Sequence, residues 1–258
     1  VTNIAADHLG QYGVNTLAAL TETKFVVRRT LADDGILVAN ADDSESVSYL
    51  AAHPRDNLCW FSLDKSNQQI RQQINLGQRC CFNDGGMLVY ADAQGISEIC
   101  SVSEVPMTLN GAALHNVHNA LGAIGVATAM GYSSAQISTG LQQFHSNAND
   151  NPGRMNYFTL RNSARVIVDF AHNAHSVAAV CDATAQIPAK RRFLMLSQPG
   201  DHSDHAIGEV TTNALEFRPD LIVTAEIADH LRGRLLGETT GVIRASAVAA
   251  GFSGDNIM

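Results

Sequence analysis

A histidine and a lysine near the start of the chain are candidates for metal chemistry. His8 follows Asp7 in the tetrapeptide DHLG, and Lys24 lies further along in a segment with helical spacing. A neutral imidazole binds divalent metals, and Mg²⁺ would recruit oxygen ligands beside it. A lysine on the partly buried side of a helix can lose its proton and react with CO₂, which gives an anionic carbamate ligand. The plainer alternatives are a surface histidine beside a helix cap and a lysine with a solvated head.

Two asparagines at residues 116 and 119 are candidates for recognising a base. They stand three apart in HNVHNALGA, so they share one face of a helix. A carboxamide offers a donor and an acceptor together, which matches the N6 and N7 edge of adenine. Capping of the helix start is an equally good interpretation of Asn116 and Asn119.

A third group of polar residues follows an apolar segment at 166–170. Asp169, His172 and Asn173 come at or just after its end. A carboxylate and an imidazole there could do acid–base work or orient a nucleotide, and a capping turn is the alternative. The sequence contains no GxxxxGK[ST], GxGxxG, HExxH or GxSxG motif. A loop that would cradle the phosphates of a nucleoside triphosphate is therefore not part of this sequence.

The sequence pattern of the first part of the chain predicts strands and helices that could position these groups. Residues 1–4 resemble the end of a buried strand, and Thr16 is a candidate N-cap for a helix. Short apolar segments and glycine-containing turns predict strands and a β-meander. The expected elements are a helix at 16–31, strands at 36–43 and 58–63, a meander at 78–100, and helices at 115–131 and 133–144.

The polar stretch at 146–154, with Pro152 and Gly153, is the expected domain boundary. Beyond it, apolar strands alternate with helices, which predicts a parallel sheet covered on both faces. Ligands in such sheets lie beyond the carboxyl ends of the strands. The expected strands are 166–170, 193–197 and 221–226, and the expected helices are 175–187, 205–217 and 239–251.

Composition narrows the class of protein. The 258 residues carry a net charge of −8, which argues against nucleic acid or an anionic membrane as the main partner. No run approaches the roughly 18 apolar residues that a membrane span needs. Five cysteines without metal-finger spacing favour the reducing cytoplasm. A disulfide between Cys80 and Cys81 is a less favoured alternative to a pair of free thiols.

Taken in order, these segments resemble the Mur ligase family of ATP-dependent amide-bond-forming enzymes. Two later stretches, PGDHSDHAIGE at 199–209 and LRGRLLGE at 231–238, are similar to the cyanophycin synthetase branch of that family. The matching pieces are TNIAADHLG, the segment around Lys24, NADD at 40–43, HNVHNAL at 115–121, NPGR at 151–154 and DFAHNA at 169–174.

The resemblance implies an α/β fold in two domains. Residues 1–152 would be a truncated Mur ligase central domain, of the P-loop ATPase type. Residues 153–258 would be a Rossmann-like C-terminal Mur ligase domain. The family's P-loop lies upstream of the segment that matches residues 2–10, so we expect Val1 to fall in the middle of the central domain.

The resemblance also implies roles for single residues. His8 and Lys24 would support Mg²⁺ and act in catalysis together with Asp169. Asn116 and Asn119 would contact adenine. The remaining matches are Arg154 and Asp169 at the nucleotide, His172 and Asn173 at the amino acid, and His202 at the substrate.

Three positions depart from the family pattern. Phe170 replaces a tyrosine and Ala174 replaces a proline. His202 stands where the family usually has an arginine, which puts recognition of an amino acid or phosphate at that turn in question.

The implied reaction uses ATP and Mg²⁺. ATP would phosphorylate a carboxylate, and an amine, with arginine as the expected amino acid, would attack the acyl phosphate. The substrate would be a small molecule or a peptide polymer, and the chain alone is predicted not to hydrolyse ATP. The alternative is a non-catalytic Mur-like module that binds an amino acid or a partner, or assembles into a homo-oligomer.

Overall fold

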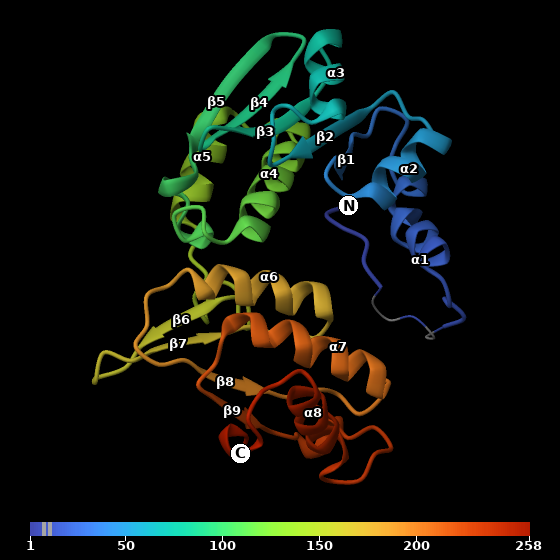
Figure 1. Cartoon of the computed structure of the whole chain (residues 1–258). Helices are drawn as coiled ribbons and strands as arrows, with labels where there is room; N and C mark the ends of the chain where they lie inside the picture. Colours follow the sequence, from blue (N-terminus) through green and yellow to red (C-terminus); the bar gives the residue numbers. More distant parts are fainter. Residues whose placement is uncertain (7–8, 10–11) are drawn as a thin grey trace. The chain divides into compact units, whose positions relative to one another are not determined.

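The computed structural model describes residues 1–6, 9 and 12–258, and these form two compact units (Figure 1). The first unit is Val1–Ser146 and the second is Asn147–Met258. Their division, between Ser146 and Asn147, falls inside the polar stretch at 146–154 that was expected to hold the domain boundary. The ranges 1–152 and 153–258 differ from these units only in where that stretch is cut.

The first unit is built on a five-stranded sheet of order β1-β2-β3-β4-β5. Strands β1 (Leu37–Asn40), β2 (Leu58–Ser62) and β3 (Cys80–Asp84) run parallel. Strands β4 (Met87–Asp92) and β5 (Gly95–Ser101) continue the sheet antiparallel, which confirms the predicted meander. The hairpin between β3 and β4 turns at Gly85 and Gly86, whose φ angles of 59° and 97° suit residues without a Cβ.

Helices flank this sheet. Thr16 caps α1 (Leu17–Lys24) as predicted, because its Oγ1 accepts a hydrogen bond from Ala19 N at 3.2 Å. The expected helix at 16–31 is shorter, since the chain tightens after Lys24 into the 3₁₀ helix η1 (Phe25–Arg29). The other helices are α2 (Ser44–Ala52), α3 (Gln68–Leu76), α4 (Leu114–Ala129) and α5 (Ser134–Gln143), with η2 (Val102–Glu104) and η3 (Pro106–Thr108) before α4.

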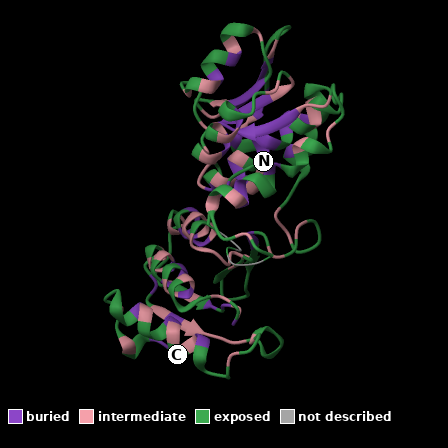
Figure 2. Cartoon of the chain, turned by 90° about the vertical axis from the view of Figure 1, so that its right-hand side faces the viewer, coloured by how far each residue is buried: buried purple, intermediate pink, exposed green. Residues whose placement is uncertain are grey.

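Both faces of this sheet are buried, as Figure 2 shows by the concentration of buried residues on its strands. Alternate side chains of one strand point to opposite faces, so Phe61 packs with Leu121 of α4 and Trp60 packs with Ile70 of α3. Helix α4 approaches the sheet closely at Gly125. A Cβ on Gly125 would lie 2.9 Å from Cγ1 of Val38.

Residues 1–4 do not form the strand that the sequence predicted. They run beside β1 nevertheless. The backbone N of Asn40 donates to Val1 O at 3.1 Å, the Asn40 side chain donates to Thr2 O at 2.7 Å, and Ile4 is buried. The apolar pattern therefore predicted the burial but not the backbone geometry.

The second unit contains two separate strand pairs and three α-helices in its described length. Strands β6 (Asn156–Thr159) and β7 (Arg165–Val168) pair antiparallel, and β8 (Phe193–Leu196) pairs parallel with β9 (Leu221–Thr224). The helices are α6 (Ala174–Ala185), α7 (Asp204–Ala214) and α8 (Glu238–Ala249), with η4 (Leu215–Phe217), η5 (Ala228–His230) and η6 (Gly254–Asn256) between or after them.

The alternation of strands and helices in this unit is confirmed, but the continuous sheet covered on both faces is not. Ile207 of α7, Ile222 of β9 and Ile243 of α8 are fully buried in one shared core. Other strand residues of this unit are exposed, at 46% for Val168 of β7 and 68% for Met195 of β8. An apolar strand pattern reports a half-buried surface as readily as a fully buried one.

Two further expectations can be compared with the described residues. None of the helices in that part of the chain is long and apolar enough to cross a bilayer. All five cysteines are buried and free, so Cys80 and Cys81 do not form the alternative disulfide.

Candidate functional site

A hydrogen-bonded carboxylate marks the carboxyl ends of the parallel strands in the first unit. Asp42 follows β1 and accepts hydrogen bonds from Ser62 Oγ at 2.6 Å, Leu63 N at 2.8 Å, His118 Nε2 at 2.9 Å and Asn67 Nδ2 at 3.0 Å. Partial burial alone would raise the pKa of Asp42. The hydrogen bonds outweigh it, so the pKa lies below its ordinary value. This network ties β1 and β2 to α4.

Helix α4 carries the two predicted adenine contacts on one face. Asn116 is buried, and its Nδ2 donates to the backbone O of Met107 at 2.8 Å. Asn119 is exposed, and its Nδ2 donates to Asn116 Oδ1 at 3.2 Å. The buried amide thereby fixes the orientation of the exposed one. Neither side chain makes the capping bond of α4, whose N-cap is Ala113.

The predicted metal pair cannot be assembled from the described residues. His8 and its neighbour Asp7 lie outside the described part of the chain. Lys24 is the last residue of α1 and is exposed, whereas the sequence predicted a partly buried face for it. After Lys24 the chain forms the 3₁₀ helix η1, in which Phe25 is buried and Val26 is 48% exposed.

The predicted Mg²⁺ site is likewise incomplete among the described residues. Among the residues that the structure describes, no group of three or more His, Cys, Asp or Glu side chains could hold a metal ion. An unmodified Lys24 ammonium is not an oxygen ligand of the kind that Mg²⁺ binds. The described residues alone therefore do not make up a Mg²⁺ site, and Mg²⁺ stays a prediction that depends on His8, outside the described part of the chain.

In the second unit, the turn that carries Arg154 is tied to the end of β7. Phe170 N donates to Gly153 O at 2.8 Å, and Met155 N donates to Asp169 Oδ2 at 2.9 Å. The Cζ of Arg154 lies 5.8 Å from the centroid of the Phe170 ring, at cation–π distance. Asp169 thus holds the turn from which Arg154 projects.

A row of rings continues from this turn. The ring centroids of Phe170 and His172 are 5.4 Å apart, and those of His172 and His202 are 6.4 Å apart. The Nδ1 atoms of the two histidines lie 3.1 Å from Phe170 O and 3.3 Å from Gln198 Oε1. The structure therefore brings Arg154, His172 and His202 of the predicted set together.

Asn173, the remaining predicted residue, caps a helix. Its Oδ1 accepts a hydrogen bond from Ser176 N at 2.9 Å, and Ser176 bonds back in a capping box. The capping turn that the sequence left open as an alternative is present. The side chain of Asn173 is thereby engaged at the start of α6.

Sequence reasoning missed two arginines that hold the turn of His202. Arg234 donates from Nε to Gly200 O at 2.8 Å and from Nη2 to His202 O at 2.7 Å. Arg232 makes a two-pronged ion pair with Asp201, at 2.9 and 2.7 Å. The segment LRGR stands out in the sequence, but its distance along the chain from residue 202 concealed the contact.

His118 and Ser62 were missed for a related reason. Each is a common polar residue, and only the sheet topology shows that both reach Asp42. The NADD motif, which contains Asp42, and the HNVHN segment, which contains His118, were each recognised in the sequence. Neither indicated that the two residues contact each other.

Comparison with known proteins identifies relatives of both units. Residues 1–127 match the Mur ligase middle domain, and residues 153–250 match the Mur ligase, glutamate ligase domain. Cyanophycin synthetase of Trichormus variabilis is 31% identical over 243 residues, which cover 94% of this chain and 26% of that protein. The chain thus spans about a quarter of the length of such curated relatives.

Solved structures show the same fold at low identity. UDP-N-acetylmuramoylalanyl-D-glutamyl-2,6-diaminopimelate–D-alanyl-D-alanyl ligase of Acinetobacter baumannii superposes with a TM-score of 0.61 at 17% identity, covering 100% of this chain and 48% of that one. Folylpolyglutamate synthase of Mycobacterium tuberculosis, complexed with ADP and AMPPCP, superposes with a TM-score of 0.58 at 18% identity. The match covers 99% of this chain and 52% of that one.

Proposed function

Because this chain belongs to the Mur ligase family, we propose that it is part of an ATP-dependent, amide-bond-forming ligase similar to cyanophycin synthetase. In the proposed reaction, ATP phosphorylates a substrate carboxylate. An amine, with the α-amino group of arginine as the expected one, then attacks the acyl phosphate. The C–N bond forms, the C–O bond to phosphate breaks, inorganic phosphate leaves and the amine gives up a proton. The expected compartment is the cytoplasm.

The observation that carries this proposal is the amide pair of α4. Asn119 is exposed and is oriented by buried Asn116, 3.2 Å away. An oriented carboxamide can donate to N7 and accept from N6 of adenine, which distinguishes adenine from the other bases. The Asp42 network fixes the same helix at the carboxyl edge of the strands, where α/β sheets bind their ligands.

The second unit supports the binding of charged substrates. Arg154, held over Phe170, offers a guanidinium that pairs with phosphate or carboxylate oxygens. His172 and His202 lie beside it and suit recognition of an amino-acid carboxylate. Asp169 is a positioning residue in this arrangement, because its Oδ2 fixes the turn of Arg154.

The experiment that tests the proposal is phosphate release by the product of the full open reading frame that contains this chain. We expect ATP-dependent release that requires both a carboxylate acceptor and an amino acid, and that is fastest with arginine. This chain alone, which lacks a GxxxxGK[ST] segment, is expected to release none. Full-length protein that binds amino acid without releasing phosphate would support the non-catalytic module instead.

A further inference from the structure

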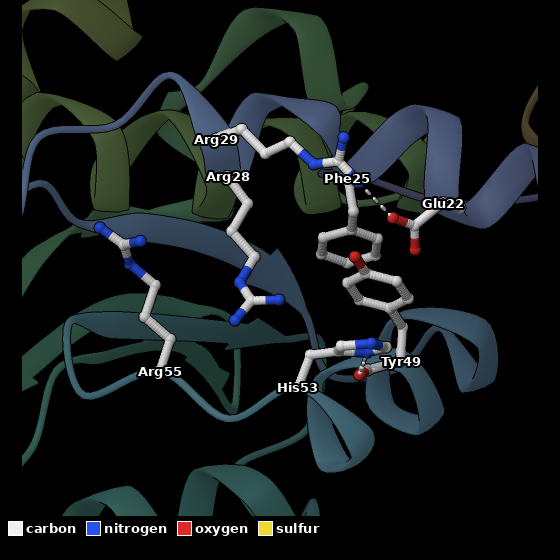
Figure 3. Close-up of a pocket in the computed structure, with 7 residues that line it drawn as sticks. All are labelled: Glu22, Phe25, Arg28, Arg29, Tyr49, His53 and Arg55. Atoms are coloured by element: carbon white, nitrogen blue, oxygen red, sulfur yellow. Dashed lines mark hydrogen bonds and ion pairs between the residues drawn. The ribbon is translucent and has the colours of Figure 1, made fainter.

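A hollow of about 410 Å³ lies in the first unit, away from the Asp42 network (Figure 3). It is formed by the end of α1, by η1, by the last turn of α2 and by the loop before β2. Helix α2 begins just beyond the carboxyl end of β1 and runs back, so its last turn lies at the amino-terminal edge of the strands. The lining residues are Glu22, Phe25, Arg28, Arg29, Tyr49, His53 and Arg55.

The lining carries more positive than negative charge. Arg29 is neutralised by Glu22, with Nη2 2.9 Å from Oε1. Arg55 donates from Nη2 to Ala32 O at 3.0 Å and to Gly35 O at 2.8 Å, and none of these partners is a carboxylate. Its buried Nε has no hydrogen-bond partner among the described residues. The charge of Arg55 is therefore not balanced by these contacts.

Arg28 is the less constrained guanidinium. Its hydrogen bond is a long one, from Nη2 to Pro54 O at 3.5 Å, and no described carboxylate pairs with it. In Figure 3 its side chain extends into the hollow between Arg55 and His53. With Arg29 balanced by Glu22, Arg28 and Arg55 leave two positive charges on the lining.

The other wall is a stack of rings. Phe25 and Tyr49 stack at 4.2 Å with 14° between their planes, and Tyr49 and His53 stack at 4.4 Å with 26°. The Nδ1 of His53 lies 3.0 Å from Tyr49 O, which leaves its other ring nitrogen available to a ligand. Phe25 is buried, so the stack is anchored at its inner end, and His53 forms its exposed outer end.

We propose that this hollow binds a phosphate-bearing small molecule. Guanidinium groups bind tetrahedral oxyanions through paired hydrogen bonds. A phosphate dianion matches the two unbalanced arginines, whereas a single carboxylate leaves one of them unpaired. The volume is that of a small-ligand site. The proposal concerns a site separate from the amide-forming one and does not depend on the proposed ligase activity.

The test is calorimetric titration of the chain, at low ionic strength and pH 7.5, with inorganic phosphate and with phenyl phosphate. These two probes distinguish free phosphate from a phosphoryl group attached to an organic part. We compare wild type with Arg28→Gln and with Arg79→Gln as a charge-matched control. Arg79 is exposed in the same unit and lies outside the pocket lining.

We expect saturable binding that weakens by about tenfold or more in Arg28→Gln, because a charge-assisted pair of hydrogen bonds is lost. Binding by Arg79→Gln stays within about twofold of wild type. Tighter binding of phenyl phosphate identifies an organic phosphate as the occupant, and equal affinity identifies phosphate itself. Absence of saturable binding, or equal weakening in both variants, would overturn the proposal.

A second measurement does not depend on the folding of a variant. Phosphate added to wild-type chain should shift the ring resonances of His53 and Tyr49 in heteronuclear NMR spectra. Those of His145, which is exposed elsewhere in the same unit, should stay in place. Shifts of similar size at all three rings would contradict a site at this hollow.

Discussion

His118 Nε2 lies 2.9 Å from Asp42 Oδ2, and this contact joins the helix of the amide pair to the end of the first parallel strand. Asp42 also accepts from Ser62 and Leu63 of the neighbouring strand and loop. A carboxylate with this many donors organises the edge of the sheet rather than reacting there. The position of Asn119 therefore depends on a contact made by the residue directly before it.

We predict that His118→Ala lowers the free energy of unfolding by about 1–2 kcal/mol, because one charge-assisted hydrogen bond to Asp42 is lost. Urea denaturation followed by circular dichroism measures the effect. His145→Ala, at an exposed position of the same unit, is the control and should change the value by less than about 0.5 kcal/mol. Equal stability of the two variants would show that the contact between His118 and Asp42 contributes nothing to stability.

The turn at Gly200 predicts a larger loss of stability than the one expected for His118→Ala. Gly200 N donates to His230 O at 2.9 Å, and an added methyl group would overlap the backbone carbonyl of Leu231. Gly200→Ala should therefore destabilise the second unit by about 1–3 kcal/mol and displace His202.

Thermal unfolding of Gly200→Ala and of a matched glycine variant separates this clash from the general effect of an added methyl group. Gly241 lies in α8, where an added Cβ would meet no described atom within 4 Å. Gly241→Ala should keep or slightly raise the melting temperature. A Gly200→Ala chain as stable as Gly241→Ala would refute the close packing of the 231–234 segment on this turn.

Glu226 predicts a pH dependence. The Thr239 hydroxyl and the backbone N–H groups of Gly237 and Thr240 donate to its carboxylate and lower its pKa to about 2. The pKa of this carboxylate is lower in the folded chain than in the unfolded chain. The ionised group therefore stabilises the fold at any pH above the unfolded-state pKa of about 4.5. This contribution is lost as the pH falls from about 4.5 towards 2.

The stability difference between wild type and Glu226→Gln should accordingly be largest at pH 7 and smaller at pH 3. Urea denaturation at both pH values measures it. Glu216→Gln, at an exposed position of the same unit, should show a difference that varies less with pH. A difference for Glu226→Gln that stays constant from pH 7 to pH 3 would contradict the role of the ionised carboxylate.

The cysteines predict resistance to thiol reagents. All five are buried, and burial raises the pKa of Cys80 to about 12 and that of Cys181 to about 11. Since the thiolate is the reactive form, a disulfide reagent should react slowly with the native chain and at five sites after unfolding in urea. Fast reaction of one thiol per native chain with the reagent would reveal a cysteine that is accessible in solution but buried in this structure.

The sequence predicted elements whose signal is local. The meander at 78–100 was predicted from its turn residues, among them Gly85 and Gly86. The helix cap was predicted from the side chain of Thr16 alone. Both predictions are confirmed. Helices α2 and α3 were not predicted. Helix α3 was missed although Ile70 and Ile74 share one of its faces, Asn67 caps its start and Gly77 ends it.

The site was predictable only in parts that lie close together in the sequence. Asn116 and Asn119 share a face because helical spacing requires it, and their hydrogen bond confirms that geometry. Arg234 reaches the turn of His202 across a long stretch of chain, which no local pattern reports. Helical spacing was extended through residues 25–29, which form a 3₁₀ helix, and Lys24 is exposed at the end of α1 instead of partly buried. Its role at a metal stays a prediction.

The measurement that tests the central claim most directly is the KM for ATP of the full open reading frame product. The comparison is between wild type, Asn119→Ala and Asn75→Ala. Asn119 and Asn75 are both exposed helical asparagines of the first unit, so neither substitution removes an apolar core side chain.

If Asn119 contacts adenine, Asn119→Ala raises the KM for ATP by about tenfold, in line with the loss of hydrogen bonds to the base. The kcat and the KM for the amino acid stay near those of wild type, and Asn75→Ala changes none of the three. An unchanged KM for ATP in Asn119→Ala would contradict the placement of the nucleotide on α4, and with it the account given for this site.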